Sequence, residues 1–301
     1  MKITVVGSTN IDMCSRVPSL PAPGETVGGG SFMQAYGGKG ANQAVAAKRL
    51  GAEVCFISAL GDDRLGDELL EYFKAQGLDV SAMVRAEGLH TGIALIMIDP
   101  RGENCIAVNP GANAALTPAH IDAARESIAS ADVLVMQAEV PYETVKHAAR
   151  IARASGTRVL YNPAPALRVD DEMLAMTDLL VVNRGESTAI SGLDGLEESA
   201  EALCRRGAAA VVVTLGADGA YYRDGSGTTL RVPAYKVKSV DAVGAGDTFC
   251  GALAVKYAAT GRVDTDALMY ATAAAALSVT REGAQPSIPT AAETIDFINR
   301  R

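Results

Sequence analysis

The sequence predicts an α/β fold of three layers, in which helices cover both faces of a central, mostly parallel β-sheet and a small second sheet is attached. Three observations support this prediction. Short runs of β-branched and other apolar residues are continuous rather than alternating, which is typical of strands covered on both faces. These runs alternate with amphipathic stretches, an order that builds right-handed βαβ units. Two further segments break the alternation in a way that is typical of paired strands.

The strands of the central sheet are predicted in order along the chain. They are Lys2–Val6, Val54–Ile57, Val133–Gln137, Arg158–Tyr161, Leu179–Val182 and Ala210–Thr214. Helices are predicted between the strands and in the Ala-rich C-terminal part, which also contains a Gly/Pro loop at Glu282–Pro289. These helices are Gln43–Leu50, Tyr142–Ala154, Asp171–Met176, a stretch from Glu186 onward, Asp247–Tyr257, Asp264–Val279 and a terminal helix.

The two exceptional segments are Met13–Tyr36 and Thr91–Val108. The first is rich in Pro, Gly and polar residues and has little helical character. The second predicts two strands, Gly92–Ile98 and Asn104–Val108, joined by a turn sequence. We expect these segments to pair into a small sheet that projects as a candidate lid. Since no linker or repeat is present, residues 1–301 are predicted to form one domain with lid segments near 13–36 and 91–108.

The composition excludes several classes of function. A chain of 301 residues with 49% hydrophobic and 21% charged residues can bury a large core. Its net charge of −8 argues against nucleic acid or an acidic membrane as partner. Neither a signal peptide nor a membrane-spanning run is evident. The 5 cysteines and 3 histidines lack the spacing of a zinc site. A cytoplasmic protein with reduced thiols is the simplest expectation.

The C-terminal part contains a glycine turn, Gly244-Ala245-Gly246, followed by Asp247 and an apolar helix. Glycines let the backbone turn sharply and approach a ligand closely. The first N–H groups of the helix are unpaired and can hold an anion. Asp247 could then accept a proton from a hydroxyl while these groups stabilise a phosphoryl group. The alternative is an acid that only stabilises the start of a helix.

A second glycine cluster, Gly37-Gly38-Lys39-Gly40-Ala41-Asn42, runs into a predicted helix. It is not a Walker A loop, because no Ser or Thr follows Lys39. It does place backbone N–H groups, a cation and an amide together, which suits a polyol. The alternative, a turn with a helix cap, explains the glycines but not Lys39 and Asn42 together. Asn10 and Asp12 follow the first strand, at the sheet edge where ligands bind, and suit sugar hydroxyls.

Together these residues resemble the ribokinase-like (PfkB-type) carbohydrate kinase family. The first family signature is similar to Gly37–Leu50 and the second to Asp241–Gly251. Other similar stretches are Pro110–Thr117, Asn162–Ala166 and Val279–Ser287. The resemblance covers nearly the whole chain. It implies a three-layer ribokinase-like fold and a kinase that acts on a pentose.

The resemblance also implies roles for individual residues. Asp247 is expected to be the catalytic base that accepts the proton of the sugar's primary hydroxyl as it attacks the γ-phosphate of ATP. The anion hole is expected at Gly244, Ala245 and Gly246. The expected sugar-binding residues are Asn10, Asp12, Gly38, Lys39, Asn42, Glu139 and Asp247. Glu139 follows a strand end, and its alternative interpretation is an ordinary surface acid.

The nucleotide and metal sites are implied in the same way. Asn183 and Glu186 match the family's Asn-x-x-Glu motif, which orients Mg²⁺ through its water shell. The nucleotide-binding residues are expected to be Asn183, Thr214, Gly216, Gly219, Gly246 and Thr272, although no role is assigned to Thr272, Arg184 or Gly185. A monovalent cation, usually K⁺, is expected at Asp241, Val243, Ser278, Arg281, Gly283 and Ser287. The alternative is that Asp241 only caps a turn.

The expected activity is therefore ATP-dependent phosphorylation of D-ribose at its 5-hydroxyl. Alternatives are a kinase for 2-deoxyribose, adenosine or a hexose, and a catalytically inactive sugar-binding regulator. The absence of Trp and the presence of only 5 Phe weaken the adenosine alternative. The intact Asp247, Lys39 and Glu186 argue against the regulator. A Rossmann dehydrogenase is excluded because no G-x-G-x-x-G follows the first strand. The family also implies a homodimer formed through the lids.

Overall fold

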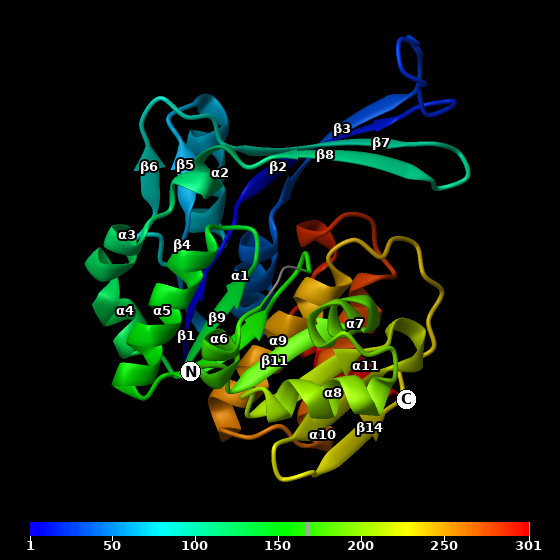
Figure 1. The fold of residues 1–301 in the computed structure, drawn as a ribbon. Helices are drawn as coiled ribbons and strands as arrows, with labels where there is room; N and C mark the ends of the chain where they lie inside the picture. Colours follow the sequence, from blue (N-terminus) through cyan, green and yellow to red (C-terminus); the bar gives the residue numbers. More distant parts are fainter. Residues whose placement is uncertain (167–168, 301) are drawn as a thin grey trace.

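A central sheet of eight strands organises the structure, a computed structural model that describes residues 1–166 and 169–300 (Figure 1). Its spatial order is β14-β13-β12-β11-β10-β9-β1-β4. The pairs from β4 to β12 are parallel, whereas β12-β13-β14 pair antiparallel. The strands are β1 (Lys2–Val6), β4 (Glu53–Ile57), β9 (Val133–Gln137), β10 (Arg158–Asn162), β11 (Leu179–Asn183), β12 (Ala210–Thr214), β13 (Ala220–Asp224) and β14 (Thr229–Val232).

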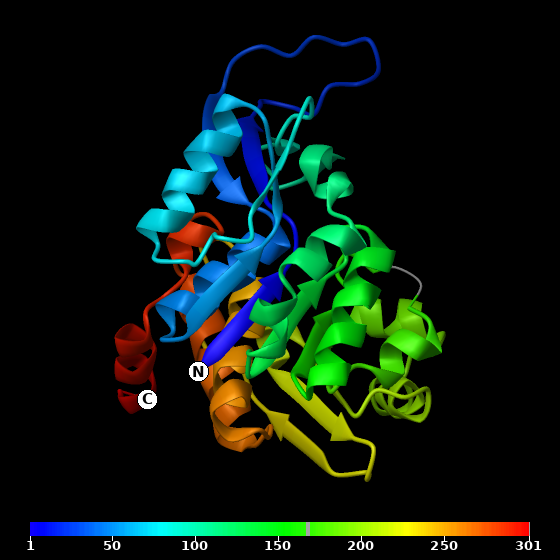
Figure 2. The same ribbon diagram turned by 90° about the vertical axis from the view of Figure 1, so that its left-hand side faces the viewer.

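Helices cover both faces of this sheet, as the views in Figures 1 and 2 show. One face packs against α1 (Lys39–Arg49), α2 (Arg64–Ala75), α9 (Ala245–Thr260) and α10 (Thr265–Ser278). The other packs against α3 (Pro118–Ala123), α4 (Arg125–Ala129), α5 (Tyr142–Ser155), α6 (Asp171–Ala175), α7 (Arg184–Ser191) and α8 (Leu196–Arg205). Successive strand residues alternate between two cores: Val133 and Val135 face one, and Leu134 and Met136 the other. This accounts for the continuous apolar runs in the sequence.

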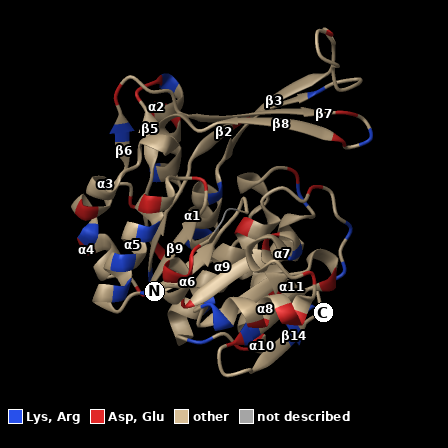
Figure 3. Cartoon of the chain, viewed as in Figure 1, with Lys and Arg blue, Asp and Glu red and all other residues tan. Residues whose placement is uncertain are grey.

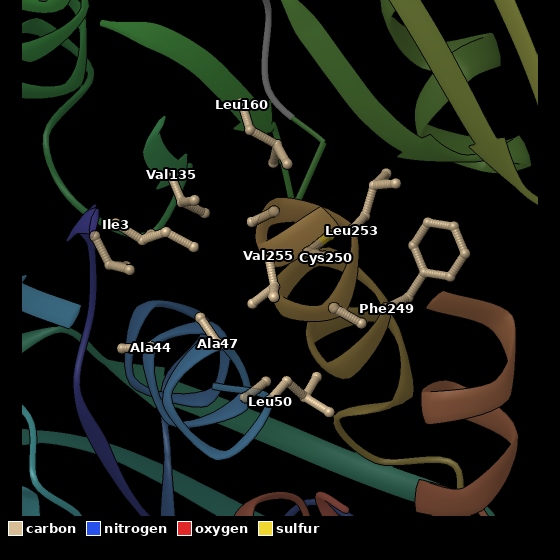
Figure 4. Close-up of a cluster of buried hydrophobic side chains, with 14 of the residues drawn as sticks. Ile3, Ala44, Ala47, Leu50, Val135, Leu160, Phe249, Cys250, Leu253 and Val255 are labelled. Carbon is tan, nitrogen blue, oxygen red and sulfur yellow. The ribbon is translucent and has the colours of Figure 1, made fainter. Parts of the chain in front are cut away.

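Small residues bring α1 and α9 into close contact. Figure 4 shows Ala47 of α1 beside Val255 of α9, with Leu253 on the side of α9 away from α1 and apolar side chains of the strands above the two helices. A Cβ added at Gly251 of α9 would lie 2.5 Å from the Cβ of Ala46 and 3.0 Å from the carbonyl oxygen of Gln43. Only glycine fits there without a shift of one helix. The polar N-terminal turns of the two helices are thereby held side by side.

A second sheet of four strands projects from the body (Figure 1). Its order is β3-β2-β7-β8, formed by β3 (Ser31–Gly37), β2 (Asn10–Arg16), β7 (Gly92–Ile98) and β8 (Asn104–Asn109). We call it the projecting sheet. Most of its strand length carries no charged side chain (Figure 3), and it exposes large apolar side chains. These are Phe32, Met33, Leu95, Ile106 and Val108.

The predicted fold class is confirmed, including the six predicted strands and the small separate sheet. Several details differ, and helices α2, α3 and α4 were not predicted. The sequence interpretation did not identify the antiparallel hairpin β13–β14 or the short pair β5 (Ala59–Gly61) and β6 (Val84–Ala86). The projecting sheet begins earlier than Met13, because Asn10 and Asp12 lie inside β2 rather than in a loop. In the described part of the chain, no helix combines the length and apolar character needed to cross a bilayer.

The remaining elements are short or C-terminal. Three single-turn 3₁₀ helices, η1 (Gly111–Ala115), η2 (Gly216–Asp218) and η3 (Gln285–Ser287), lie in loops. Helix α11 (Ala291–Asn299) follows η3 and begins with a capping box of Thr290 and Glu293. The loop between α10 and α11, which carries η3, reaches the N-terminal turn of α9. This contact positions one wall of the candidate site.

Candidate active site

The candidate site is centred on Asp247, a buried residue in the first turn of α9. Gly244 precedes the helix in the left-handed conformation, with φ 75°, and a Cβ there would lie 3.0 Å from the Cβ of Ala284. Glycine is therefore required both for the turn and for the close approach of the α10–α11 loop. Asp247 faces a cavity of ≈ 370 Å³, which Lys39, Glu186 and Gly246 also line.

The start of α9 offers hydrogen-bond donors to an anion. Within the described residues, the N–H groups of Gly246 and Asp247 find no protein acceptor, and Gly246 is exposed to the cavity. The predicted donor Ala245 differs, because its N–H donates to the carbonyl oxygen of Ala242 at 3.3 Å. Free N–H groups at the positive end of a 16-residue helix make a site for a phosphoryl group.

Charged side chains surround Asp247 on several sides. Asp247, Glu139 and Glu186 raise the pKa of Lys39 in spite of its burial, so Lys39 stays cationic. Burial, with Glu139 and Asp247 nearby, raises the pKa of Asp12 to about 6. Burial is also the main cause that raises the pKa of Glu186, and the charge of Asp247 adds to it. The carboxylates of Asp12, Glu139, Glu186 and Asp247 thus lie around Lys39. Because negative charge is in excess here, the site suits a ligand that brings a cation or hydroxyl groups that donate hydrogen bonds.

The predicted sugar residues Asn10 and Asp12 lie beside the glycine cluster that precedes α1. A Cβ at Gly37 would lie 2.3 Å from a carboxylate oxygen of Asp12, and a Cβ at Gly38 would lie 2.8 Å from the backbone nitrogen of Asn10. The structure therefore brings these four residues together. The glycines are needed here for close packing of the backbone against β2, as well as for any contact with a ligand.

Asn113, in η1, was missed by the sequence interpretation. Its Oδ1 accepts from the N–H of Thr9 at 2.9 Å, and its Nδ2 donates to the carbonyl oxygen of Thr9 at 3.0 Å and to Oδ1 of Asn10 at 2.8 Å. The buried amide of Asn113 thus fixes the orientation of the Asn10 amide. The stretch Pro110–Thr117 carried a family resemblance, but the sequence held no signal for this contact.

Glu139 joins the end of β9 to the start of α1. Its Oε2 accepts from the N–H of Lys39 at 2.9 Å and from Oγ of Ser8 at 2.5 Å. It is therefore more than a free surface acid. By holding the first turn of α1, the carboxylate positions Lys39 and the following Asn42.

Of the buried side-chain amides behind Asp247, Asn42 was predicted as a sugar-binding residue, whereas the others escaped prediction as site residues. Asn42 and Gln43 each donate to one oxygen of the Asp247 carboxylate, at 2.9 and 3.0 Å. Further amides contact these two in turn: Gln137, Asn162 and Gln285. Buried polar residues within an apolar helix and at the ends of buried strands are the signal that could have indicated them.

A second cavity, of ≈ 460 Å³, adjoins the first. The predicted nucleotide residues Thr214, Gly216, Gly219, Gly246 and Thr272 all line it, and Asn183 lines the first cavity. Three of them, Thr214, Gly216 and Gly246, line both cavities. The rest of the wall is largely apolar and includes Ala234, Val237, Phe249, Ala275 and Ala276. A long ligand with an apolar end and an anionic end fits this pair of cavities.

Asn183 and Glu186 form the capping box of α7. Oδ1 of Asn183 accepts from the N–H of Glu186, and Oε2 of Glu186 accepts from the N–H of Asn183, both at 2.8 Å. Both side chains also line the first cavity. A half-buried carboxylate with a raised pKa, close to Lys39 and Asp247, fits a hydrated divalent cation. Arg184 lies 3.8 Å from Asp218 across α7 and η2.

The residues predicted to bind a monovalent cation lie in two loops that pack together. Asp241 accepts from the N–H of Val243 at 3.0 Å and from the N–H of Gly283 at 2.9 Å. The side chain of Arg281 pairs with Glu293, so only its carbonyl could face a cation. In the portion of the chain that the structure describes, no group of three His, Cys, Asp or Glu could hold a metal. A cation here would depend on one carboxylate and carbonyl oxygens.

A base beside an anion-binding helix start, at the junction of a polar and an apolar cavity, is typical of enzymes that transfer a phosphoryl group to a hydroxyl. Comparison with known proteins agrees with this class. The sequence pattern of the pfkB family of carbohydrate kinases matches residues 1–291. The chain belongs to this family, and it is a sugar kinase.

Individual relatives and solved structures are similar over nearly the full chain. The ribokinase of Haemophilus influenzae is 38% identical, with 98% of both chains covered. The deoxyribokinase of Salmonella typhi is 34% identical, with 99% of both covered. The structure of Arabidopsis thaliana ribokinase complexed with ribose and ATP has a TM-score of 0.92 at 28% identity and 98% coverage of each chain. Thermotoga maritima ribokinase has a TM-score of 0.91 at 36% identity, with 99% of each chain covered.

Proposed function

We propose that the chain transfers the γ-phosphoryl group of ATP to the 5-hydroxyl of D-ribose, giving ribose 5-phosphate and ADP. The observation that carries this proposal is the position of Asp247. Its carboxylate stands at the free N–H groups of α9, where the polar and apolar cavities meet. Full-length similarity to ribokinases, one of them solved with ribose and ATP, supports the choice of substrates.

The sugar occupies the polar end of the site in this proposal. The side chains of Asn10, Asp12 and Asn42, with Glu139 and Lys39, offer donors and acceptors for its hydroxyls, and Gly38 allows close approach. Asp12 and Glu139 accept hydrogen bonds from hydroxyls, and Lys39 donates to oxygen atoms. The 5-hydroxyl then points to Asp247.

Asp247 accepts the proton of the 5-hydroxyl as the oxygen attacks the γ-phosphorus. The new bond joins the 5-oxygen to phosphorus, while the bond from phosphorus to the bridging oxygen of ADP breaks. The N–H groups of Gly246 and Asp247 stabilise the charge that develops on the transferring group, and Gly244 holds the turn that aims them. Lys39 adds a positive charge beside the same path.

ATP is proposed to place its base in the apolar cavity and its phosphates between Thr214, Gly216 and Gly246. Glu186 and Asn183 would hold Mg²⁺ through water, and bound Mg²⁺ neutralises the charge of the phosphates. The loops of Asp241 and Gly283 would hold K⁺ through carbonyl oxygens. Asp241 already ties these loops together, so a cation there would stiffen the turn at Gly244.

The projecting sheet is proposed to cover the sugar and to pair with that of a second copy. Asp12 shares a face of this sheet with apolar residues on its own strand and on the neighbouring strands. These are Cys14, Met33, Ala94, Ile96, Ile106 and Val108. Three of these six, Met33, Ile106 and Val108, are exposed large hydrophobics, and a dimer would bury them. With free cysteines and ATP as a substrate, the cytoplasm is the proposed location.

Release of ADP from MgATP, measured sugar by sugar in K⁺ and in Na⁺ buffer, tests the activity. We expect rapid, K⁺-stimulated turnover with D-ribose and a loss of about 10²- to 10⁴-fold in kcat for Asp247→Asn. Thr157→Val, which removes a buried hydroxyl at the far end of β10, serves as the control for folding. Ribose binding without turnover on any pentose would instead support a sugar-binding regulator.

A preference for 2-deoxyribose is the second candidate, because the deoxyribokinase relative is almost as similar as the ribokinases. The ratio of kcat/KM for the two sugars decides between them. A site that hydrogen-bonds the 2-hydroxyl should reject the deoxy sugar strongly, since its polar groups would be left unpaired.

A further inference from the structure

Two arms of buried amides converge on Asp247. In the first, Nε2 of Gln137 donates to Oε1 of Gln43 at 2.7 Å, and Nε2 of Gln43 donates to Oδ1 of Asp247 at 3.0 Å. In the second, Nε2 of Gln285 donates to Oδ1 of Asn42 at 3.1 Å, and Nδ2 of Asn42 donates to Oδ2 of Asp247 at 2.9 Å. Gln43, Gln137 and Gln285 are completely buried. Each carboxylate oxygen thus receives one N–H from the protein.

The direction of the first arm is set by a backbone group. Nδ2 of Asn162 donates to the carbonyl oxygen of Val181 at 2.8 Å, so Oδ1 of Asn162 must face Gln43. Nε2 of Gln43 donates to that oxygen at 3.0 Å and to Asp247, so both of its hydrogens are used. Oε1 of Gln43 then turns to Gln137. Asn162 and Gln137 are direct partners in the β9–β10 register, which keeps them side by side.

Both arms end in an oxygen without a partner. Among the described residues, Oε1 of Gln137 and Oε1 of Gln285 are buried and accept no hydrogen bond. Leaving a buried acceptor unpaired costs stability. If the amide of Gln137 or Gln285 were reversed, its oxygen would instead face the acceptor oxygen of Gln43 or Asn42. In both arms, the amides therefore keep the orientation that directs an N–H to Asp247, although this leaves one glutamine oxygen without a partner.

From this arrangement, which rests on the proposed role of Asp247 as the base, we propose that Gln43 is a positioning residue for the reaction and that Gln137 orients it. Gln43 lines neither cavity and contacts Asp247 only from behind. Its N–H prevents rotation of the carboxylate, so that the free lone pairs face the sugar hydroxyl. Gln137 acts one step further away, by preventing Gln43 from presenting its oxygen to Asp247.

The test compares Gln43→Met, Gln137→Met and Asp247→Asn with the intact chain, in kcat, in KM for ribose and ATP, and in the pH profile of kcat/KM. For Gln43→Met we expect kcat to fall about 10- to 100-fold, the loss of one hydrogen bond to a charged group, with both KM values within about 3-fold. The acidic limb of the profile should move to higher pH. Gln137→Met should change both quantities in the same direction by a smaller factor.

The other titratable groups around Asp247 remain in these variants, so a moved limb reports the missing donor. These groups are Lys39 on α1, Asp12 on β2, Glu186 on α7 and the thiol of Cys250 on α9. The variant Thr157→Val, which loses a buried hydrogen bond elsewhere, should lower the melting temperature without moving the limb.

The outcomes separate this proposal from the proposed function. If Asp247→Asn abolishes turnover while Gln43→Met keeps the kcat and pH profile of the intact chain, Gln43 has no positioning role, although the base stands. A lower melting temperature with an unchanged profile also overturns the proposal, since it shows only a structural role. If Asp247→Asn stays active, the base assignment itself is wrong, and the positioning role falls with it.

Discussion

The two ends of the site, on either side of Asp247, are walled by different kinds of residue. The sugar end consists of buried polar side chains that bind one another, such as Asn10 with Asn113 and Asn42 with Gln285. The nucleotide end is lined mainly by alanine, valine and glycine, with a few polar side chains among them: Thr214, Tyr235, Lys236, Ser239 and Thr272. Polar side chains interlocked in this way are held in one orientation before any ligand arrives. An apolar wall instead accepts a flat ring by shape and leaves recognition to backbone groups.

This difference predicts where substitutions act. Loss of one amide at the sugar end leaves its buried partner unpaired, so affinity for the sugar should fall sharply. Loss of one apolar side chain at the nucleotide end removes only contact area. Asp247 and the turn before it lie between the two ends. Changes there should lower kcat rather than the affinity for the sugar or for ATP.

Apart from Asp247 itself, the largest effect is expected at the glycine turn that precedes it. Gly244→Ala forces a side chain into the left-handed region and places its Cβ 3.0 Å from that of Ala284. Strain of about 1–3 kcal/mol in this loop should misplace the N–H groups of Gly246 and Asp247 and lower kcat by about 10- to 100-fold. Steady-state kinetics with both substrates saturating measures this loss.

Gly261→Ala is the matched control for that variant. Gly261 ends the same helix α9 in the same left-handed conformation, with φ 72°, and an added Cβ would meet only the guanidinium of Arg158, 3.1 Å from its Nη1. Gly261→Ala should lower the melting temperature about as much as Gly244→Ala does, and it should leave kcat unchanged. Equal losses of kcat in the two variants would show that α9 stability, and not the turn at Gly244, controls the rate.

A somewhat smaller effect is expected from Asn113→Leu, at the sugar end. This substitution frees the amide of Asn10 and leaves the backbone of Thr9 without its partners. We expect KM for ribose to rise about 10-fold or more, since an unpaired buried group costs about 1–3 kcal/mol. KM for ATP, measured in the same preparation, should stay the same. A parallel rise in both values would contradict the separation of the two ends.

Much of this arrangement could be predicted from the sequence, because it is encoded locally. The buried strands appear as apolar runs, and Asp247 and Lys39 lie in short glycine-containing motifs. Asn113, Gln137 and Gln285 could not be assigned roles in this way. Each is a single amide among unrelated neighbours, and its partner lies 94 or more positions away in the chain. Only the packing of α1 against α9 and the strand register bring such pairs together.

The hairpin β13–β14 was missed for a different reason. Its strands are short, at 5 and 4 residues, and they follow a parallel series whose alternation with helices suggests another βα unit. The turn sequence Asp224-Gly225-Ser226-Gly227 between them was the available signal. The carboxylate of Asp224 accepts from the N–H of Ser226 and of Thr228, both at 2.9 Å, so this turn is locally encoded after all.

The sugar end should also respond to pH through Asp12. Burial and the neighbouring acids raise the pKa of this carboxyl to about 6, so it is ionised above that pH and protonated below it. Sugar hydroxyls donate to the ionised form, which means that affinity is complete above the pKa and is lost as the pH falls through it. Between about pH 7 and about pH 5 we expect KM for ribose to rise about 10-fold.

Asp12→Asn provides the check on this pH effect. The variant should bind ribose more weakly at neutral pH, and its KM for ribose should no longer change between about pH 7 and about pH 5. KM for ATP over the same range reports any general effect of acid. If the variant kept the pH dependence of the intact chain, another carboxyl at the sugar end, such as Glu139, would be responsible.

The smallest effect is expected from Thr272→Val at the nucleotide end. The hydroxyl of Thr272 donates to the carbonyl oxygen of Met269 at 2.9 Å, one turn earlier in α10, and the residue is 5% exposed. The donor is therefore directed to its own helix, and the cavity meets mainly the methyl group. Valine has the same shape, and it removes a bond that contributes little within a helix. KM for ATP should change less than about 2-fold, as loss of a weak contact predicts. A rise of about 10-fold, measured by ADP release at saturating ribose, would mean that the hydroxyl turns toward the base when ATP binds, and that the nucleotide end also recognises its ligand through a side chain.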